Sequence, residues 1–186
     1  MRRLALSLSL LLLACKTAAP TADASSTQTG PDPALYYPLA VGNSWTYQQR
    51  GSARRETIQI IGRDGPWYLD DHRGRIRYES DGVRDADRYL LRAPLAAGGH
   101  WNAVDNMVVQ RFEVRSLDAS AVTEAGTFTR CAVIRNEQLL QKGARFVTEW
   151  TYAPKVGLVQ LVTSTLDAKG RQQEQTRLQL VAYRVQ

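Results

Sequence analysis

Apolar and polar residues alternate in short runs from Leu35 to the C-terminus, and turn-forming residues separate these runs. Ile58 and Ile60 share one side of their run, and Phe112 and Val114 share one side of another. A period of two places successive side chains on opposite faces of a β-strand, and short runs bounded by Gly, Pro and Asp are typical of antiparallel sheets. No run has the period of an amphipathic helix. The pattern therefore predicts a single antiparallel all-β domain over residues 35–186.

We predict about ten strands in this domain. Polar segments such as Arg63–Pro66, Ser80–Val83 and Asp167–Gly170 are the predicted turns. Such a set can form a strongly curved sheet, a half-barrel or a sandwich, because the alternation is the same in all three. The predicted strands cover residues 45–50, 56–61, 67–69, 75–79, 88–92, 108–115, 125–135, 145–152, 158–163 and 176–185.

The phrase Pro-Leu-Ala-x-Gly-x-x-Trp occurs at Pro38–Trp45 and again at Pro94–Trp101, an offset of 56 residues (94 − 38). Proline fixes φ, glycine permits a positive φ in a turn, and leucine and tryptophan can anchor in a core. We therefore interpret each copy as the opening of a β-segment, with Pro154–Gly157 as a weaker echo. A duplication and recurrent turn chemistry both account for the repeat.

The composition is that of a globular protein, with 44% hydrophobic and 23% charged residues. The formal charge of +6 does not indicate a nucleic-acid partner, because the basic residues are spread along the chain among 18 acidic ones. Two of the positive charges, Arg2 and Arg3, also lie in a segment that we expect to be removed.

The N-terminus has the pattern of a secretion signal over residues 1–14. Arg2 and Arg3 precede an apolar run from Leu4 to Leu13 that is too short to span a bilayer. The run ends in Leu12-Leu13-Ala14-Cys15. This ending resembles the bacterial lipobox, in which a diacylglyceryl group is attached to the cysteine before cleavage in front of it. The resemblance implies that Cys15 is the lipidated first residue of the mature chain; the alternative is a plain signal peptide with an incidental cysteine.

Residues 15–34 are expected to connect the lipid to the domain as a flexible tether. They are small and polar, contain proline and show no apolar periodicity, and a chain of this length spans about 25 Å. Two or three acyl chains would anchor the protein stably at a membrane without a transmembrane helix. An aspartate directly after the lipidated cysteine resembles the inner-membrane retention signal of enteric bacteria. This chain has Lys16 at that position, which favours the outer membrane in a Gram-negative cell.

The domain itself resembles a widespread group of uncharacterised bacterial exported proteins, many of them lipoproteins. Their mature part opens with a phrase like Phe-Pro-Leu-x-x-Gly-x-x-Trp-x-Tyr, matched here by Tyr37–Tyr47. A middle phrase, Ala-Gly-x-Phe-x-x-Cys, matches Ala125–Cys131, and a late phrase, Tyr-Ala-x-x-Val-Gly-Leu-Val, matches Tyr152–Val159. The resemblance implies a β-rich envelope domain and supplies no catalytic residues. Tyr37 is a departure, since phenylalanine is commoner there.

The common catalytic signatures are absent from the sequence: there is no Gly-x-Ser-x-Gly, no His-Glu-x-x-His, no P-loop and no Gly-x-Gly-x-x-Gly. We therefore expect a non-enzymatic protein without cofactor or metal. One alternative is a hydrolase that uses Asp70, Asp71 and His72, although such a run is more often a solvated turn. A second weak signal, resembling a calcium loop, consists of Asp81, Asp85 and Asp87, which arginines interrupt.

Two further features have a structural and a functional interpretation. Cys131 is the only thiol left once Cys15 is modified, and its place in a strand favours a buried, inert thiol over a nucleophile. Arg73, Arg75 and Arg77 form a basic stripe in which Arg75 and Arg77 point away from the core. The stripe could meet lipid phosphates or another anionic polymer, but a soluble outer strand face is the simpler interpretation.

The sequence thus favours a lipid-anchored envelope lipoprotein that serves as a binding or accessory module. Its partners would be the membrane, through the lipid, and an envelope protein or an apolar ligand. The alternative is a carrier whose curved sheet holds a lipid or another apolar molecule. The cavity for that ligand would be lined by the four tryptophans. The simpler interpretation is that the tryptophans fill the core: Trp45, Trp67, Trp101 and Trp150.

Overall fold

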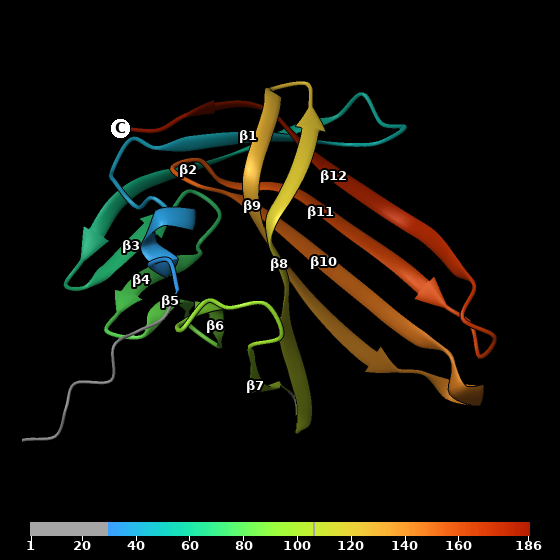
Figure 1. Cartoon of the computed structure of the whole chain (residues 1–186). Coiled ribbons are helices and arrows are strands. Elements are labelled where there is room, and N and C mark those ends of the chain that lie inside the picture. Colours follow the sequence, from blue (N-terminus) through green and yellow to red (C-terminus); the bar gives the residue numbers. More distant parts are fainter. Residues whose placement is uncertain (1–29, 106) are drawn as a thin grey trace, which may run out of the picture.

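The protein is described here by a computed structural model that covers residues 30–105 and 107–186. The expected signal peptide, Cys15 and most of the expected tether lie outside the described residues. The all-β prediction is confirmed, since the described chain contains twelve strands, two short 3₁₀ turns and no α-helix (Figure 1). In the part of the chain that the structure covers, no helix has the length and apolarity needed to cross a membrane. The strands are β1 (Ser44–Gln49), β2 (Arg55–Asp64), β3 (Trp67–Asp70), β4 (Arg75–Glu79), β5 (Gly82–Asp85), β6 (Tyr89–Arg92), β7 (His100–Asp105), β8 (Val108–Thr123), β9 (Gly126–Leu139), β10 (Arg145–Ala153), β11 (Gly157–Leu166) and β12 (Gln172–Arg184).

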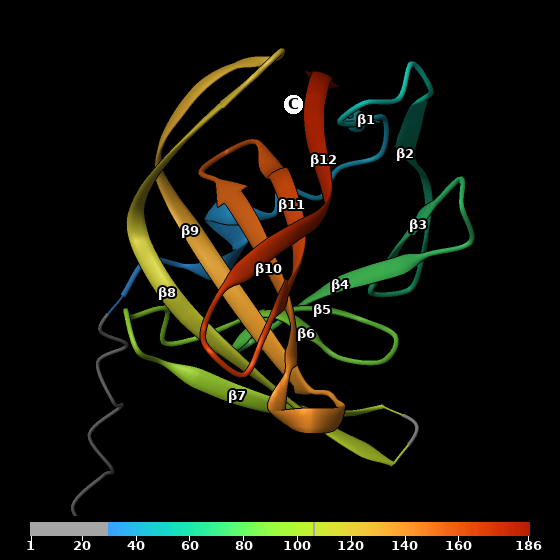
Figure 2. The ribbon, with the colours of Figure 1, turned by 90° about the vertical axis from the view of Figure 1, so that its right-hand side faces the viewer.

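All twelve strands belong to one antiparallel sheet in the order β6-β5-β4-β3-β2-β1-β12-β11-β10-β9-β8-β7. Neighbours in space are also neighbours in sequence, except where β1 pairs with β12. The sheet therefore consists of two six-stranded meanders, β1–β6 and β7–β12, that meet at the chain ends. It curves until β6 and β7 approach each other, so it is nearly closed into a barrel (Figure 2). Of the three predicted shapes, the strongly curved sheet is correct and the two-sheet sandwich is wrong.

The prediction of about ten strands missed two. The sequence predicts a turn at Gly82 and Val83, but these residues open β5, because the hairpin loop is only Ser80–Asp81. Residues 100–105, directly before the predicted strand 108–115, form β7. A glycine weakens the sequence pattern that predicts a strand, yet only glycine fits at position 82 of β5. A Cβ on Gly82 would lie 2.3 Å from the carbonyl oxygen of Leu91.

The two copies of the repeated phrase build the same turn. Gly42 and Gly98 have φ of 94° and 82°, in the left-handed region that favours glycine. Their amides donate to the carbonyls of Ile60 and Val114, each at 2.8 Å. The amides of Ile60 and Val114 donate back to the residue after each glycine, at 2.9 and 2.8 Å. Each copy therefore starts a six-stranded meander by pairing its first strand with its second, which confirms the structural role predicted for the phrase.

The tryptophans of the two copies are core residues at the two joins of the sheet. Trp45 and Trp101 are each 5% exposed. The Trp45 indole N–H donates to the carbonyl of Val156 at 2.6 Å. The Trp101 indole N–H donates to the carbonyl of Tyr89 at 3.2 Å, and this bond links β7 to β6 across the unpaired edge. The tryptophans thus fill the core and also donate to backbone carbonyls at the two joins.

Asn43, the residue after the first glycine, holds the two chain ends together. Its side chain is fully buried. The amide nitrogen donates to the carbonyl of Pro38 at 3.0 Å, and the amide oxygen accepts the backbone N–H of Gln186 at 3.0 Å. The sequence alone does not indicate this role of Asn43, because its partner Gln186 comes close only through the pairing of β1 with β12.

Folded contacts begin slightly before position 35. The carboxylate of Asp32 accepts the backbone N–H of Ala34 at 2.8 Å and caps the 3₁₀ turn η1 (Pro33–Tyr36). Pro33 and Tyr36 are buried in that turn. The described chain starts at Gly30, where an added Cβ would lie 2.2 Å from the carbonyl oxygen of Leu95, in the β6–β7 connection. The N-terminal segment therefore enters the domain beside β6.

Candidate functional site

Asp70, Asp71 and His72 build the turn between β3 and β4. The Asp70 carboxylate accepts the backbone N–H of His72 at 2.9 Å and of Gly74 at 2.6 Å. The Asp71 carboxylate accepts the backbone N–H of Gln59 at 2.9 Å. His72 is exposed and its Nε2 lies 3.1 Å from the carbonyl oxygen of Thr57. Both carboxylates are thus engaged with backbone groups, as in an ordinary polar turn.

Asp81, Asp85 and Asp87 do not converge. Asp81 accepts the Tyr89 hydroxyl at 2.7 Å, while Asp85 accepts the backbone N–H of Asp87 at 2.8 Å and of Arg88 at 2.7 Å. In residues 30–105 and 107–186, no three His, Cys, Asp or Glu side chains are grouped as metal ligands would be. The turn interpretation of these aspartates fits their geometry.

Cys131 is fully buried in β9, and burial raises the pKa of its thiol. A thiolate is the reactive form, so burial and a raised pKa both suppress nucleophilic reactivity. This environment matches the inert thiol that the sequence favours.

In the Cys15→Ser chain, Cys131 is expected to be unreactive toward a soluble disulfide reagent at neutral pH, with one thiol titrating only after denaturant is added. The rate at which the reagent's thiol leaving group is released, before and after denaturant is added, measures this reactivity. Rapid reaction in the native state would mean that β9 opens easily or that the thiol is accessible.

The tryptophans do not line one apolar cavity. Trp45 and Trp101 are packed in the core, and Trp101 stacks on Phe112 with ring centroids 5.6 Å apart. The guanidinium of Arg88 lies 5.0 Å from the Phe112 ring and 5.2 Å from the Trp150 ring. Beside it a hollow of about 300 Å³ is lined mainly by polar side chains, including Asp85 and Arg88. Such a lining suits an acyl chain poorly.

The predicted basic stripe is organised around Trp67. Arg75 and Arg77 lie on the same face of β4, opposite Ile76, which packs against the core. Their guanidinium carbons lie 4.9 and 4.4 Å from the centre of the Trp67 ring. Arg77 also forms an ion pair with Glu79. Two of the three predicted arginines are therefore brought together, while Arg73 remains in the β3–β4 turn.

A second group of the same kind lies on the next two strands. The guanidinium carbons of Arg84 and Arg92 lie 5.6 and 4.9 Å from the centre of the Tyr89 ring. A register shift between Val83 and Arg84 makes this possible, because it pairs Arg84 with Tyr89 while Val83 still pairs with buried Leu91. The extra residue in β6 thus turns Tyr89 toward the outer face, a common effect of a β-bulge.

The two groups form one continuous surface on the outside of β3–β6. Arg77 pairs in register with Arg84, and Arg84 with Tyr89. Trp67, on β3, lies beside Arg77 of β4. We call this surface the arginine–aromatic face; its members are Trp67, Arg75, Arg77, Arg84, Tyr89 and Arg92.

The face carries more positive than negative charge. Its four arginines have two carboxylate partners among the described residues, Glu79 on Arg77 and Asp81 on Arg92. The Tyr89 hydroxyl and Arg92 hold the pKa of Asp81 below its usual value, so this partner is ionised at neutral pH. Arg75 and Arg84 have no carboxylate partner in the described chain, and Arg84 donates only to the carbonyls of Asp85 and Ala86.

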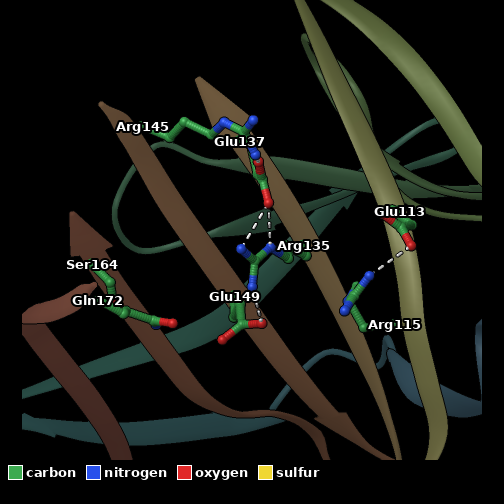
Figure 3. A network of polar contacts seen from close by, with 8 residues as sticks. All are labelled: Glu113, Arg115, Arg135, Glu137, Arg145, Glu149, Ser164 and Gln172. Atoms are coloured by element: carbon green, nitrogen blue, oxygen red, sulfur yellow. Dashed lines mark hydrogen bonds and ion pairs between the residues drawn. The ribbon is translucent and has the colours of Figure 1, made fainter. Parts of the chain in front are cut away.

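The outer face of β8–β12 is built differently. Figure 3 shows Arg135 between Glu137 and Glu149, with nitrogen–oxygen distances of 2.7 and 3.2 Å. Arg145 also binds Glu137, at 3.1 Å. Burial alone would raise the pKa of Glu137, but Arg135 and Arg145 hold it below its usual value. Arg115 and Arg177 likewise pair with Glu113 and Glu174. The arginines of this network are neutralised by carboxylates, whereas Arg75 and Arg84 on β4 and β5 lie against aromatic rings without a carboxylate partner.

This contrast makes the arginine–aromatic face the candidate functional site. Stacking on a ring orients a guanidinium and leaves its charge and most of its N–H groups available. Four such groups on adjacent strands suit an anionic ligand with several oxygens, since Arg binds phosphate and carboxylate in a bidentate manner. Alternation in the sequence predicts the outward side of Arg75 and Arg77 but does not join them to Arg84, Tyr89 and Arg92. Of these three, only Tyr89 has a side that depends on the bulge, which pairs it with Arg84.

No protein-family model and no curated protein matches the sequence. Two solved structures have a similar backbone fold. One is a candidate exported protein with a YmcC-like fold from Bacteroides fragilis, at 12% identity and a TM-score of 0.47, covering 81% of this chain and 99% of that one. The other is a candidate lipoprotein from Parabacteroides distasonis, at 12% identity and a TM-score of 0.44, covering 83% of this chain and all of that one. At this identity no residue role transfers between the proteins.

Proposed function

We propose that the protein is a lipid-anchored envelope lipoprotein that acts as a non-enzymatic binding module. The observation that supports the lipid anchor is the order of features at the N-terminus: Arg2-Arg3, then the apolar run, then Leu-Leu-Ala directly before Cys15. Removal of residues 1–14 would leave Cys15 as the first residue, modified with lipid. In a Gram-negative cell, Lys16 after the cysteine favours the outer membrane.

The binding role is supported by what the polar groups of the domain do. Asp70, Asp71 and Asp85 accept backbone N–H groups of turns, so they are not arranged around a common substrate position. The arginine–aromatic face, in contrast, carries cations that the domain does not neutralise. The alternative of an apolar carrier has less support, because Trp45 and Trp101 are packed in the core and the hollow beside Arg88 is lined mainly by polar side chains.

The anchor is tested by replacing its acceptor. Cys15→Ser is expected to release the protein from membranes in fractionated cells and to abolish labelling by an alkyne fatty acid. The domain should stay folded, because residue 15 lies outside the predicted β-domain, residues 35–186. Cys131→Ala is the matched control and should remain membrane-bound and labelled, since its thiol is buried. Cys15→Ser protein that still sediments with membranes after a high-salt wash contradicts the anchor.

A further inference from the structure

We propose that the arginine–aromatic face is a docking site for the headgroup phosphates of an anionic lipid surface. The lipid-anchored domain would then lie against the membrane on the outer side of β3–β6. The inference rests on the proposed function in one respect, because the anchor at Cys15 is what holds this face close to headgroups.

Two like charges lie opposite each other on neighbouring strands of the face. Arg77 and Arg84 are cross-strand partners in register, and like charges directly opposite each other destabilise a sheet pair. Only one of the two, Arg77, has a carboxylate partner. Its Nε–H is also buried without an acceptor. An anion bound between the two strands would relieve this repulsion, whereas Arg135, Arg145 and Arg177 on β9, β10 and β12 already have carboxylate partners.

Preorganisation is the second argument. Trp67 lies against both Arg75 and Arg77, and Tyr89 against both Arg84 and Arg92. Each ring fixes two long side chains that would otherwise lose rotamer entropy on binding. Adjacent strands lie about 4.8 Å apart, so the four guanidinium groups are spread over a surface wide enough for several phosphates. Trp and Tyr are also the side chains that favour the interface between water and lipid.

Proximity is the third argument. The first described residue, Gly30, lies against Leu95 in the connection that follows β6, so the chain enters the domain beside the edge of the face (Figure 1). The expected tether, with a span of about 25 Å, would keep the domain within reach of the surface in which the proposed lipid sits. Membrane phosphates are therefore the anions that this face meets at the highest local concentration.

Vesicle flotation tests the face apart from the anchor. The mature chain with Cys15→Ser is mixed with vesicles of phosphatidylcholine alone or of phosphatidylcholine with phosphatidylglycerol. Binding is expected only to the anionic vesicles and is expected to be lost at high salt, which screens exposed charges. Adding Arg75→Gln and Arg84→Gln should lower the partition coefficient about 25-fold, since each basic residue near an anionic surface contributes roughly fivefold.

The matched control removes the same charge elsewhere. Arg115→Gln with Arg145→Gln alters two exposed arginines that have carboxylate partners, and should change partition less than about twofold. Equal losses in both double variants would reduce the effect to net charge and overturn the proposal. The pair Arg75→Lys and Arg84→Lys keeps the charge and should keep most of the binding, which separates loss of charge from loss of fold.

Two other outcomes overturn the proposal. One is absence of binding to the anionic vesicles. The other is binding of soluble polyphosphate that depends on Arg75 and Arg84 while vesicles are not bound, because the ligand would then be a polymer. Neither outcome bears on the anchor, since every flotation sample carries Cys15→Ser. Conversely, failure of the fatty-acid labelling test leaves vesicle binding by the face unaffected.

Discussion

Replacing Trp45 by alanine is expected to lower the free energy of unfolding by about 3–5 kcal/mol. The indole is nearly fully buried and packs against Gly157, where an added Cβ would lie 3.2 Å from the indole nitrogen. The substitution also leaves the Val156 carbonyl without its indole donor, which adds a desolvation cost. Urea denaturation of the Cys15→Ser chain, followed by far-UV circular dichroism, measures the change.

Trp101→Ala should cost a similar amount, because Trp101 is as buried and stacks on Phe112. Trp67→Ala is the control: this ring lies on the outer face between two arginines, so its loss should cost about 1 kcal/mol or less. If Trp45→Ala and Trp67→Ala shift the urea midpoint equally, the core role of the repeated phrase is wrong.

Gly82→Ala is expected to destabilise the protein by about 3 kcal/mol, a large effect for one methyl group. The new Cβ would lie 2.3 Å from the Leu91 carbonyl oxygen and 3.1 Å from the Arg92 Cα, so β5 and β6 would have to separate. Hydrogen exchange should show the loss of protection in these two strands first, because β6 is an edge strand.

Gly62→Ala is the matched control for this substitution. Gly62 lies in β2, and a Cβ there would meet nothing within 4 Å. Since glycine weakens a strand relative to alanine, the change should be neutral or slightly stabilising. A Gly82→Ala variant as stable as Gly62→Ala would show that the β5–β6 pair tolerates a wider spacing than the structure gives it.

Most of the fold was predictable because a strand imposes a short, local period. Ile58 and Ile60, and Phe112 and Val114, face the core as the alternation predicts. The repeated phrase also gave its turns correctly, since a glycine with positive φ and a buried leucine and tryptophan are local requirements. Strand order was not predictable. It depends on the pairing of β1 with β12, and no property of either strand alone specifies that partner.

The candidate site was only half predictable for a related reason. Alternation placed Arg75 and Arg77 outside, but it gave no reason to join them to Arg84 or Tyr89. Those neighbours depend on cross-strand register and on one extra residue in β6. The predicted turn over Ser80–Val83 also hid β5, the strand that carries Arg84. Cys15 was predicted from sequence alone and lies outside the described residues, so the lipid anchor stays a prediction.

The pairing of β1 with β12 also determines when folding can finish. These strands come from opposite ends of the described chain, so the two meanders join only after Arg184 is free to pair with Ser44. Closing such a long loop costs entropy before any contact compensates for it. A growing chain therefore stays incomplete while its last strand is still held by a ribosome or a translocation channel. For any protein that must cross a membrane unfolded, this layout delays completion of the sheet until passage has ended.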